Sequence, residues 1–267
     1  MQRVEARGAL SLALRDGRTR PQRLFQEGAA KIRLPRVSGE PAEAVLINTA
    51  GGLTGGDRLA WAVELGAGSA AVVTTQACEK IYRAGAGHAE VSAALSVEAG
   101  ARLAWLPQET IVFEGGALSR RLEASLARDA EALIVEATVF GRTARGERVQ
   151  LGRFADRWRI YRQGQLVHAE DFAIGPDIDA TLRRAAAANG AVAMATVLAI
   201  GDAPETKVAA ARHIVGDAGG VSAWTVGQSG KLLARLVAAD GYALRQRLVP
   251  LIELLNGQAG LPKVWSL

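Results

Sequence analysis

The sequence holds few of the side chains from which tight metal and redox sites are built. Among 267 residues there are one cysteine and three histidines. A single cysteine excludes an internal disulfide, leaves the redox compartment open and favours the cytosol. A closed zinc site needs four cysteine or histidine ligands. The separations of the four available residues match no local zinc motif: Cys78, His88, His168 and His213. We therefore predict no tightly bound metal cofactor.

Weak coordination of a divalent ion by carboxylates, with an occasional histidine, stays open. The string HAED, residues 168–171, is the best local candidate because it places His168 close to Glu170 and Asp171. A surface loop with solvated charges explains the same string, and the sequence alone favours that simpler interpretation.

Long hydrophobic runs are also absent. No segment approaches the roughly 20 uncharged apolar residues that a membrane-spanning helix requires. The N-terminal residues 1–17 hold no apolar stretch of the length found in signal peptides. We therefore predict a soluble, cytoplasmic protein with no membrane partner.

Aromatic residues make up only 5% of the chain, although its formal net charge is +5. A basic protein can meet an acidic protein, a nucleic acid or a membrane surface. The densest basic clusters, residues 15–23 and 119–123, belong to no basic helix and are not interleaved with aromatics. Nucleic-acid binding is therefore not predicted, and the basic residues are interpreted as a solvated surface.

Motifs for nucleotide binding and for nucleophilic catalysis are missing. Gly51 and Gly56 have the spacing of a phosphate-binding loop, but Asp57 and Arg58 follow where that loop needs a lysine and a hydroxyl. No G-x-S-x-G string is present. Two of the 27 acidic residues meeting in space would suffice for glycoside chemistry, which the sequence leaves open.

Short strands separated by turns dominate the first 200 residues. Residues 59–65 and 89–97 alternate apolar and smaller or polar side chains, as half-buried strands do. Residues 70–76 and 131–140 are apolar on both faces and predict more deeply buried strands. Turn signals recur every 8–15 residues or so without intervening helices, which predicts an antiparallel all-β array. No exact repeat supports a perfect solenoid.

Helical patterns come late in the chain. Residues 179–190 fit a short helix or a loop, and residues 203–220 begin with Pro204 in a helix-start position. Residues 232–237 carry leucines at helical spacing, and a further helix is expected from about 240 to 257, with Pro250 marking a kink or a boundary. We predict one domain, residues 1–267, with a β body over about 8–200 and helical additions over about 203–257.

Two strings place polar side chains directly after buried strands. Residues 72–85 pass from VVTT into QACEKIYRAG, and residues 104–116 read AWLPQETIVFEGG. Polar groups in this position indicate the lining of an interior channel or an interface. An ordinary strand end followed by a solvated turn is the simpler explanation.

Five strings in order resemble the urease accessory protein UreD family, called UreH in some species. They are NTAGGLTGGDRL (48–59), TTQACEKIYRA (74–84), LPQETIVFEGG (106–116), VFGRTARGE (139–147) and DRWRIYRQG (156–164). The tail LPKVWSL (261–267) is also similar to that family's ending. The resemblance runs from about residue 10 to the end of the chain.

The resemblance implies a non-catalytic scaffold, or chaperone, for urease maturation. Members of the family bind the urease structural subunits and the accessory protein UreF, which carries the nickel-supplying GTPase UreG. The family fold is a mainly β, two-layer, β-helix-like stack of short strands with a small helical part near the C-terminus. Its interior is expected to pass nickel transiently, without a tightly bound cofactor.

The resemblance also assigns roles by motif position. Lining of the nickel path is expected for Asp57, Glu79, Glu136 and Glu170, although at Glu79 the family often has a small neutral residue. Cys78 offers a thiolate or, more commonly, a small buried hydrophobe. Architectural or interface roles are expected for Gly51, Gly52, Gly55, Gly56, Lys80, Tyr82, Arg83 and Glu109.

Two other functions remain as alternatives. A β-solenoid enzyme acting on an acidic polysaccharide fits a basic surface on stacked strands, and it requires an acid–base pair in an open groove. The other is a carboxylate-rich metal-binding protein, which tight nickel binding by the isolated chain would favour over the conduit.

Overall fold

The computed structural model describes residues 3–36, 39–142 and 146–266. Two of the motifs that resemble the family, at 139–147 and 261–267, extend into residues outside these ranges. Within these ranges, seventeen strands form two sheets, and the α-helices lie in the part of the chain from Ile178 onward.

The seven-stranded sheet has the spatial order β14-β13-β11-β8-β5-β1-β2. Its strands, in chain order, are β1 (Glu5–Arg15), β2 (Arg18–Glu27), β5 (Arg58–Leu65), β8 (Ala89–Val97), β11 (Ala117–Leu126), β13 (Arg153–Arg162) and β14 (Gln165–Ile174).

The ten-stranded sheet has the order β16-β17-β15-β12-β9-β6-β4-β3, with β10 paired to β12 and to β7. Its strands are β3 (Ala30–Arg33), β4 (Ala42–Asn48), β6 (Ala70–Thr75), β7 (Glu79–Ile81), β9 (Arg102–Leu106), β10 (Thr110–Val112), β12 (Glu131–Phe140), β15 (Ala193–Gly201), β16 (Gly219–Val226) and β17 (Ser229–Ala238).

The α-helices are α1 (Ile178–Leu182), α2 (Val208–Val215) and α3 (Gly241–Asn256). Short 3₁₀ turns at Pro204–Lys207, Gly216–Ala218, Gly257–Ala259 and Lys263–Ser266 flank or follow them. The predicted helix over 203–220 is confirmed as α2 between two of these turns, and α3 confirms the predicted helix over 240–257. Helix α3 continues through Pro250, so this proline marks no boundary. No helix in the described ranges has both the length and the apolarity needed to cross a membrane.

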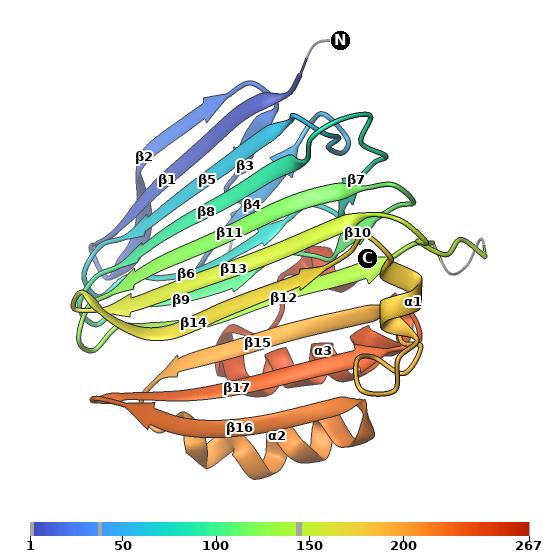
Figure 1. The fold of residues 1–267 in the computed structure, drawn as a ribbon. Coiled ribbons are helices and arrows are strands. Elements are labelled where there is room, and N and C mark those ends of the chain that lie inside the picture. Colours follow the sequence, from blue (N-terminus) through green and yellow to red (C-terminus); the bar gives the residue numbers. More distant parts are fainter. Residues whose placement is uncertain (1–2, 37–38, 143–145, 267) are drawn as a thin grey trace.

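The two sheets lie face to face and the chain passes back and forth between them (Figure 1). The predicted stack of short strands in two layers is confirmed, with a helical layer added on the outer face of the ten-stranded sheet at the C-terminal end. One apolar core fills the space between the sheets, and a second joins the ten-stranded sheet to α2 and α3.

The prediction of an antiparallel array is wrong for the body of the stack. Strands β1, β5, β8, β11 and β13 run parallel to one another, as do β4, β6, β9 and β12. Antiparallel pairs occur at the ends of these series, for example between β1 and β2. The turns that predicted hairpins are mostly corners at which the chain changes sheet. Consecutive strands therefore stack across the core, and each strand pairs with one from the next circuit.

The prediction of helix at residues 232–237 is also wrong, and so is the end of the β body near residue 200. Residues 229–238 form β17, paired with β15 on one side and β16 on the other. Leu232 and Leu236 face the helical layer, whereas Leu233 packs against the core between the sheets. A strand with apolar side chains on both faces loses its period-two pattern and imitates a helix.

Candidate functional site

A cavity of about 360 Å³ lies between the two sheets, where the edge strand β14 ends above the ten-stranded sheet. Figure 1 shows β14 at the edge of its sheet, in front of β12, with β15 drawn below it. Strands β11, β13 and β14 line it from one side, and β12, β15, β16 and β17 from the other. Five charged side chains contribute to its wall: Arg120, Glu136, Asp156, Glu170 and Arg235.

Strand alternation directs these charges inward. Arg120 lies between the buried Leu118 and Leu122 on β11, and Asp156 lies between Phe154 and Trp158 on β13. Because side chains two residues apart share a face of a strand, both charged groups point into the core. Burying them is costly unless they are paired.

Arg120 pairs with carboxylates from both sheets. Its guanidinium donates to Asp156 at 3.1 Å (Nε to Oδ1) and 2.6 Å (Nη2 to Oδ2), and to Glu136 Oε2 at 2.5 Å. The indole of Trp105 donates to the other Glu136 oxygen at 3.0 Å, and Thr110 Oγ1 accepts from Arg120 at 3.2 Å. This cluster joins the sheets through one fully buried arginine and two carboxylates.

The electrostatics of the cluster follow from its burial. Burial raises the pKa of Glu136, and Arg120 opposes that rise. Burial alone would lower the pKa of Arg120, but Asp156 and Glu136 together raise it. One arginine thus faces two carboxyl groups on the cavity wall.

Glu170 supplies a second ion pair at the same cavity. Its Oε2 accepts from Arg235 Nη2 at 2.6 Å and lies 4.0 Å from His168 Nε2. Burial raises the pKa of Glu170, and Arg235 limits that rise. Burial, with Lys231 and Arg235 nearby, lowers the pKa of His168 to about 4, so its imidazole is neutral at physiological pH. His168 Nε2 is buried without a hydrogen-bond partner among the described residues.

Glu79 lies at a different place. Asn48 Nδ2 donates to both of its carboxylate oxygens at 3.1 Å, and burial raises its pKa. It lines a hollow of about 130 Å³ together with Asn48, Cys78 and Trp61, and this hollow shares no lining residue with the larger cavity.

Both carboxylate oxygens of Asp57 accept hydrogen bonds from backbone N–H groups. Its Oδ1 accepts the Val4 N–H at 2.9 Å and its Oδ2 accepts the Thr54 N–H at 2.8 Å. The side chain is buried, and it lines none of the cavities described above. In this position Asp57 fastens the N-terminal segment to the glycine-rich loop.

The loop itself is shaped by close contacts. A Cβ on Gly55 would lie 2.1 Å from the Ala86 carbonyl oxygen, and one on Gly52 would lie 2.4 Å from the Tyr82 ring. Gly51 and Gly56 have positive φ angles of 76° and 89°. The Tyr82 ring packs on Phe113 with centroids 5.2 Å apart.

Lys80 and Arg83 contribute to this loop through their backbones. The Lys80 carbonyl accepts the Leu53 N–H at 2.7 Å, and the Arg83 carbonyl accepts the Thr54 hydroxyl at 2.7 Å. Both side chains are exposed.

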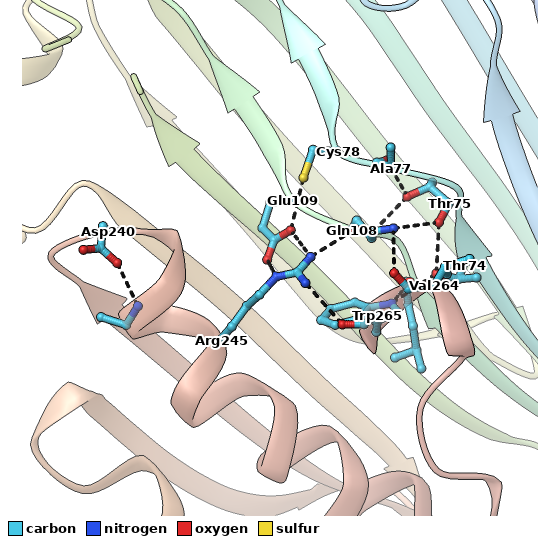
Figure 2. A network of polar contacts seen from close by, with 12 residues as sticks. Thr74, Thr75, Ala77, Cys78, Gln108, Glu109, Asp240, Arg245, Val264 and Trp265 are labelled. Carbon is cyan, nitrogen blue, oxygen red and sulfur yellow. Dashed lines mark hydrogen bonds and ion pairs between the residues drawn. The ribbon is translucent and has the colours of Figure 1, made fainter. Parts of the chain in front are cut away.

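Glu109 anchors the helical layer (Figure 2). Arg245 of α3 donates to its two oxygens at 2.6 and 2.8 Å and to Gln108 Oε1 at 3.0 Å. The indole of Trp265 in the C-terminal tail donates to Thr74 Oγ1 at 3.1 Å. Burial would raise the pKa of Glu109, but Arg245 outweighs it and lowers that pKa. The network ties α3 and the tail to the ten-stranded sheet.

Cys78 borders the same network. Its Sγ lies 3.4 Å from Glu109 Oε2. Burial, together with the negative charge of Glu109, raises the thiol pKa to about 11. A thiol with this pKa is protonated near neutral pH and is a poor metal ligand or nucleophile.

The structure thus brings Glu136 and Glu170 together and places Asp57 and Glu79 elsewhere. Sequence reasoning missed Arg120, Asp156 and Arg235, which complete the cavity wall. For Arg120 and Asp156 the signal was available, because each is a charged residue on the apolar face of an alternating strand. Across the described ranges, no group of three or more histidine, cysteine or acidic side chains is arranged to hold a metal ion.

Comparison with known proteins gives matches over nearly the whole chain. The family model described as UreD urease accessory protein matches residues 4–266. A relative named urease accessory protein UreD from Mesorhizobium japonicum is 59% identical over 266 residues, covering 100% of this chain and 95% of that one. Relatives from Brucella melitensis and Brucella suis are each 57% identical over 267 residues, covering 100% of this chain and 95% and 96% of theirs. The chain therefore belongs to the UreD family of urease accessory proteins.

Proposed function

We propose that the protein is a non-catalytic scaffold for urease maturation that passes nickel through its interior. In this proposal it binds the urease structural subunits and UreF, with UreG held through UreF. Membership of the urease accessory family, over essentially the full length of the chain, supports a role in urease maturation. The binding of the urease subunits, UreF and UreG, and the passage of nickel, are proposed in addition to that role.

One observation carries the nickel path. Three carboxylates from three successive strands, Glu136, Asp156 and Glu170, converge on one cavity between the sheets. Oxygen ligands attract a divalent cation electrostatically, whereas tight retention of nickel favours additional imidazole or thiolate ligands. Because each carboxylate already has an arginine partner, the cavity offers attraction without a closed cage. This balance suits an ion that must be released.

The same geometry weighs against the polysaccharide enzyme. Glycoside chemistry needs one carboxyl group that holds a proton and one that is free to act as a base or nucleophile. Here Glu136 and Asp156 share Arg120, and Glu170 is paired with Arg235. The ion pairs hold these groups in structural contacts, which favours a scaffold.

Co-expression tests the scaffold directly. The tagged chain, UreF and the urease structural subunits are produced together, and the tagged chain is captured. We expect UreF and the urease subunits to co-purify with it. Failure of both to co-purify contradicts the scaffold, and tight nickel binding by the isolated chain favours a metal-binding protein instead.

A further inference from the structure

The strand β2 forms the edge of the seven-stranded sheet furthest from the β14 edge and its cavity. Figure 1 shows β1 and β2 at the N-terminal end of the stack, remote from the helical layer. Nine of the ten β2 residues are exposed, an unusual proportion for a strand of this length. This edge is therefore a separate surface of the molecule.

The register of β1 and β2 sorts their side chains onto two faces. Leu24 lies opposite the buried Leu10, on the inner side of the strand, but is itself 45% exposed, whereas Phe25 lies opposite Ala9 and faces outward. Arg20 and Arg23 lie opposite Ala13 and Ser11, on the same outer face. We call the outward set of Arg15, Arg18, Arg20, Arg23 and Phe25 the arginine face.

Among the described residues, the arginines of this face form no ion pairs, although Glu27 of β2 and Glu64 of β5 also lie on the outer side of the sheet. In the described part of the chain, no acidic oxygen lies within 4.0 Å of any of its four guanidinium groups, whereas Arg58, Arg157 and Arg159 on the same sheet are paired. Arg15 also lies directly opposite Arg18. Like charges opposite one another in a sheet are destabilising. The chain thus keeps a repulsive arrangement that an acidic ligand would relieve.

The neighbouring strand provides room for that ligand. Ala9, Ser11 and Ala13 lie beside the arginine row and have small, half-buried side chains, so they present little bulk to a bound segment. Phe25 is 42% exposed at the end of the row and offers one apolar contact. Arginine recognises carboxylates through paired, charge-assisted hydrogen bonds.

The chemistry favours a protein over a single-stranded nucleic acid. Stacking of successive bases requires a series of aromatic side chains. The arginine face has only Phe25, at one end. Protection of the edge against aggregation is the simpler explanation, because charges and Pro21 blunt strand edges. It does not account for the exposed phenylalanine at the end of the charged row.

We propose that the arginine face docks an extended acidic segment of a partner protein. The inference rests on the proposed function only in that both require a protein complex. It assigns no role to the nickel cavity at the opposite edge, so either can fail alone.

The test uses the full-length chain and a fluorescent peptide of alternating glutamate and threonine with a central leucine. We expect anisotropy to report salt-sensitive binding that the double variant Arg20→Glu/Arg23→Glu weakens by about tenfold or more. The matched control Arg128→Glu/Arg184→Glu makes the same change in net charge at exposed arginines elsewhere. It should bind like the wild type, and circular dichroism should show that both variants are folded.

Three results overturn the proposal. One is the absence of binding at low salt, and another is an equal loss in the two double variants, which would indicate an effect of net charge alone. The third is tighter binding of oligothymidine that displaces the peptide, which would assign the face to nucleic acid. Failure of nickel delivery, with peptide binding intact, would contradict the nickel path and would not contradict docking at the arginine face.

Discussion

At the scale of single residues, the site depends on charges placed on the buried side of strands. Arg120 is only 6% exposed and makes four hydrogen bonds to three side chains of both sheets. An alternating pattern predicts that such a residue points inward, but it does not say which carboxylates it meets. Those partners come from β12 and β13, and their pairing depends on the stacking of circuits. The interpretation of the basic cluster 119–123 as solvated surface is therefore wrong for Arg120, and its place on the apolar face of β11 was the signal that was missed.

Replacing Arg120 should be strongly destabilising. Arg120→Met leaves Glu136 and Asp156 buried without their cation, which typically costs about 3–5 kcal/mol. The neighbouring Arg121 is exposed on the opposite face of β11, so Arg121→Met is the matched control and should change stability by less than about 0.5 kcal/mol. Denaturant unfolding of both variants measures the difference. Equal stabilities would contradict a structural role for the cluster.

Cys78 should react slowly. Its thiol pKa of about 11 exceeds the usual value of 9.0, so the thiolate fraction near neutral pH is about 100-fold lower than for an unperturbed thiol. Alkylation of the folded protein by iodoacetamide should be slower than alkylation of the unfolded chain by at least that factor. Comparable rates in the two states would show that the thiol is neither buried nor raised in pKa.

At the scale of elements, local patterns predicted where strands lie better than how they pair. The runs at 70–76 and 131–140 are buried strands, as predicted, because apolar side chains on both faces require cover on both sides. Parallel pairing between circuits left no signal in any short window. The strand β17 was mistaken for a helix for the related reason that both of its faces are apolar. Helix α3 was recognisable from its amphipathic pattern and from Asp240, whose side chain caps Ala243 N–H at 2.8 Å.

The attachment of α3 yields a prediction at this scale. Glu109→Gln removes the charge that pairs with Arg245 and should cost about 3 kcal/mol of unfolding free energy at neutral pH. Glu253→Gln changes an exposed residue of the same helix and should be nearly neutral. Hydrogen exchange should quicken in α3 only in the first variant.

The stability that Glu109 contributes through Arg245 should decrease as the solution is acidified. Because the folded-state pKa of Glu109 is lowered, its stabilisation is present above the unfolded value near 4.5 and is lost as the pH falls through the folded value. The stability difference between wild type and Glu109→Gln should therefore shrink with acidification below about pH 4.5. A difference that stays constant down to strongly acidic pH would contradict the ion pair.

At the scale of the whole molecule, the stack keeps two kinds of surface apart. The cavity lies at the β14 edge of the seven-stranded sheet, and the arginine face lies at its β2 edge. The mainly β stack and the family were predictable, because several specific strings occur in order along the chain. The meeting of Glu136 and Glu170 at one cavity was not, since it depends on β14 folding back over β12. Asp57 was expected from its motif to line the path, but its carboxylate accepts hydrogen bonds from backbone amides instead.

The nickel content of urease matured with Glu170→Gln tests the central claim most directly. Glutamine keeps the shape of the side chain and removes the charge at the cavity, so we expect urease nickel to fall by about half or more. Asp171→Asn changes the adjacent, exposed carboxylate and is the control, with nickel expected at the wild-type level. Complexes are compared at equal yields of co-purified urease. Wild-type nickel content with Glu170→Gln, in complexes that assemble normally, would contradict a nickel path through this cavity.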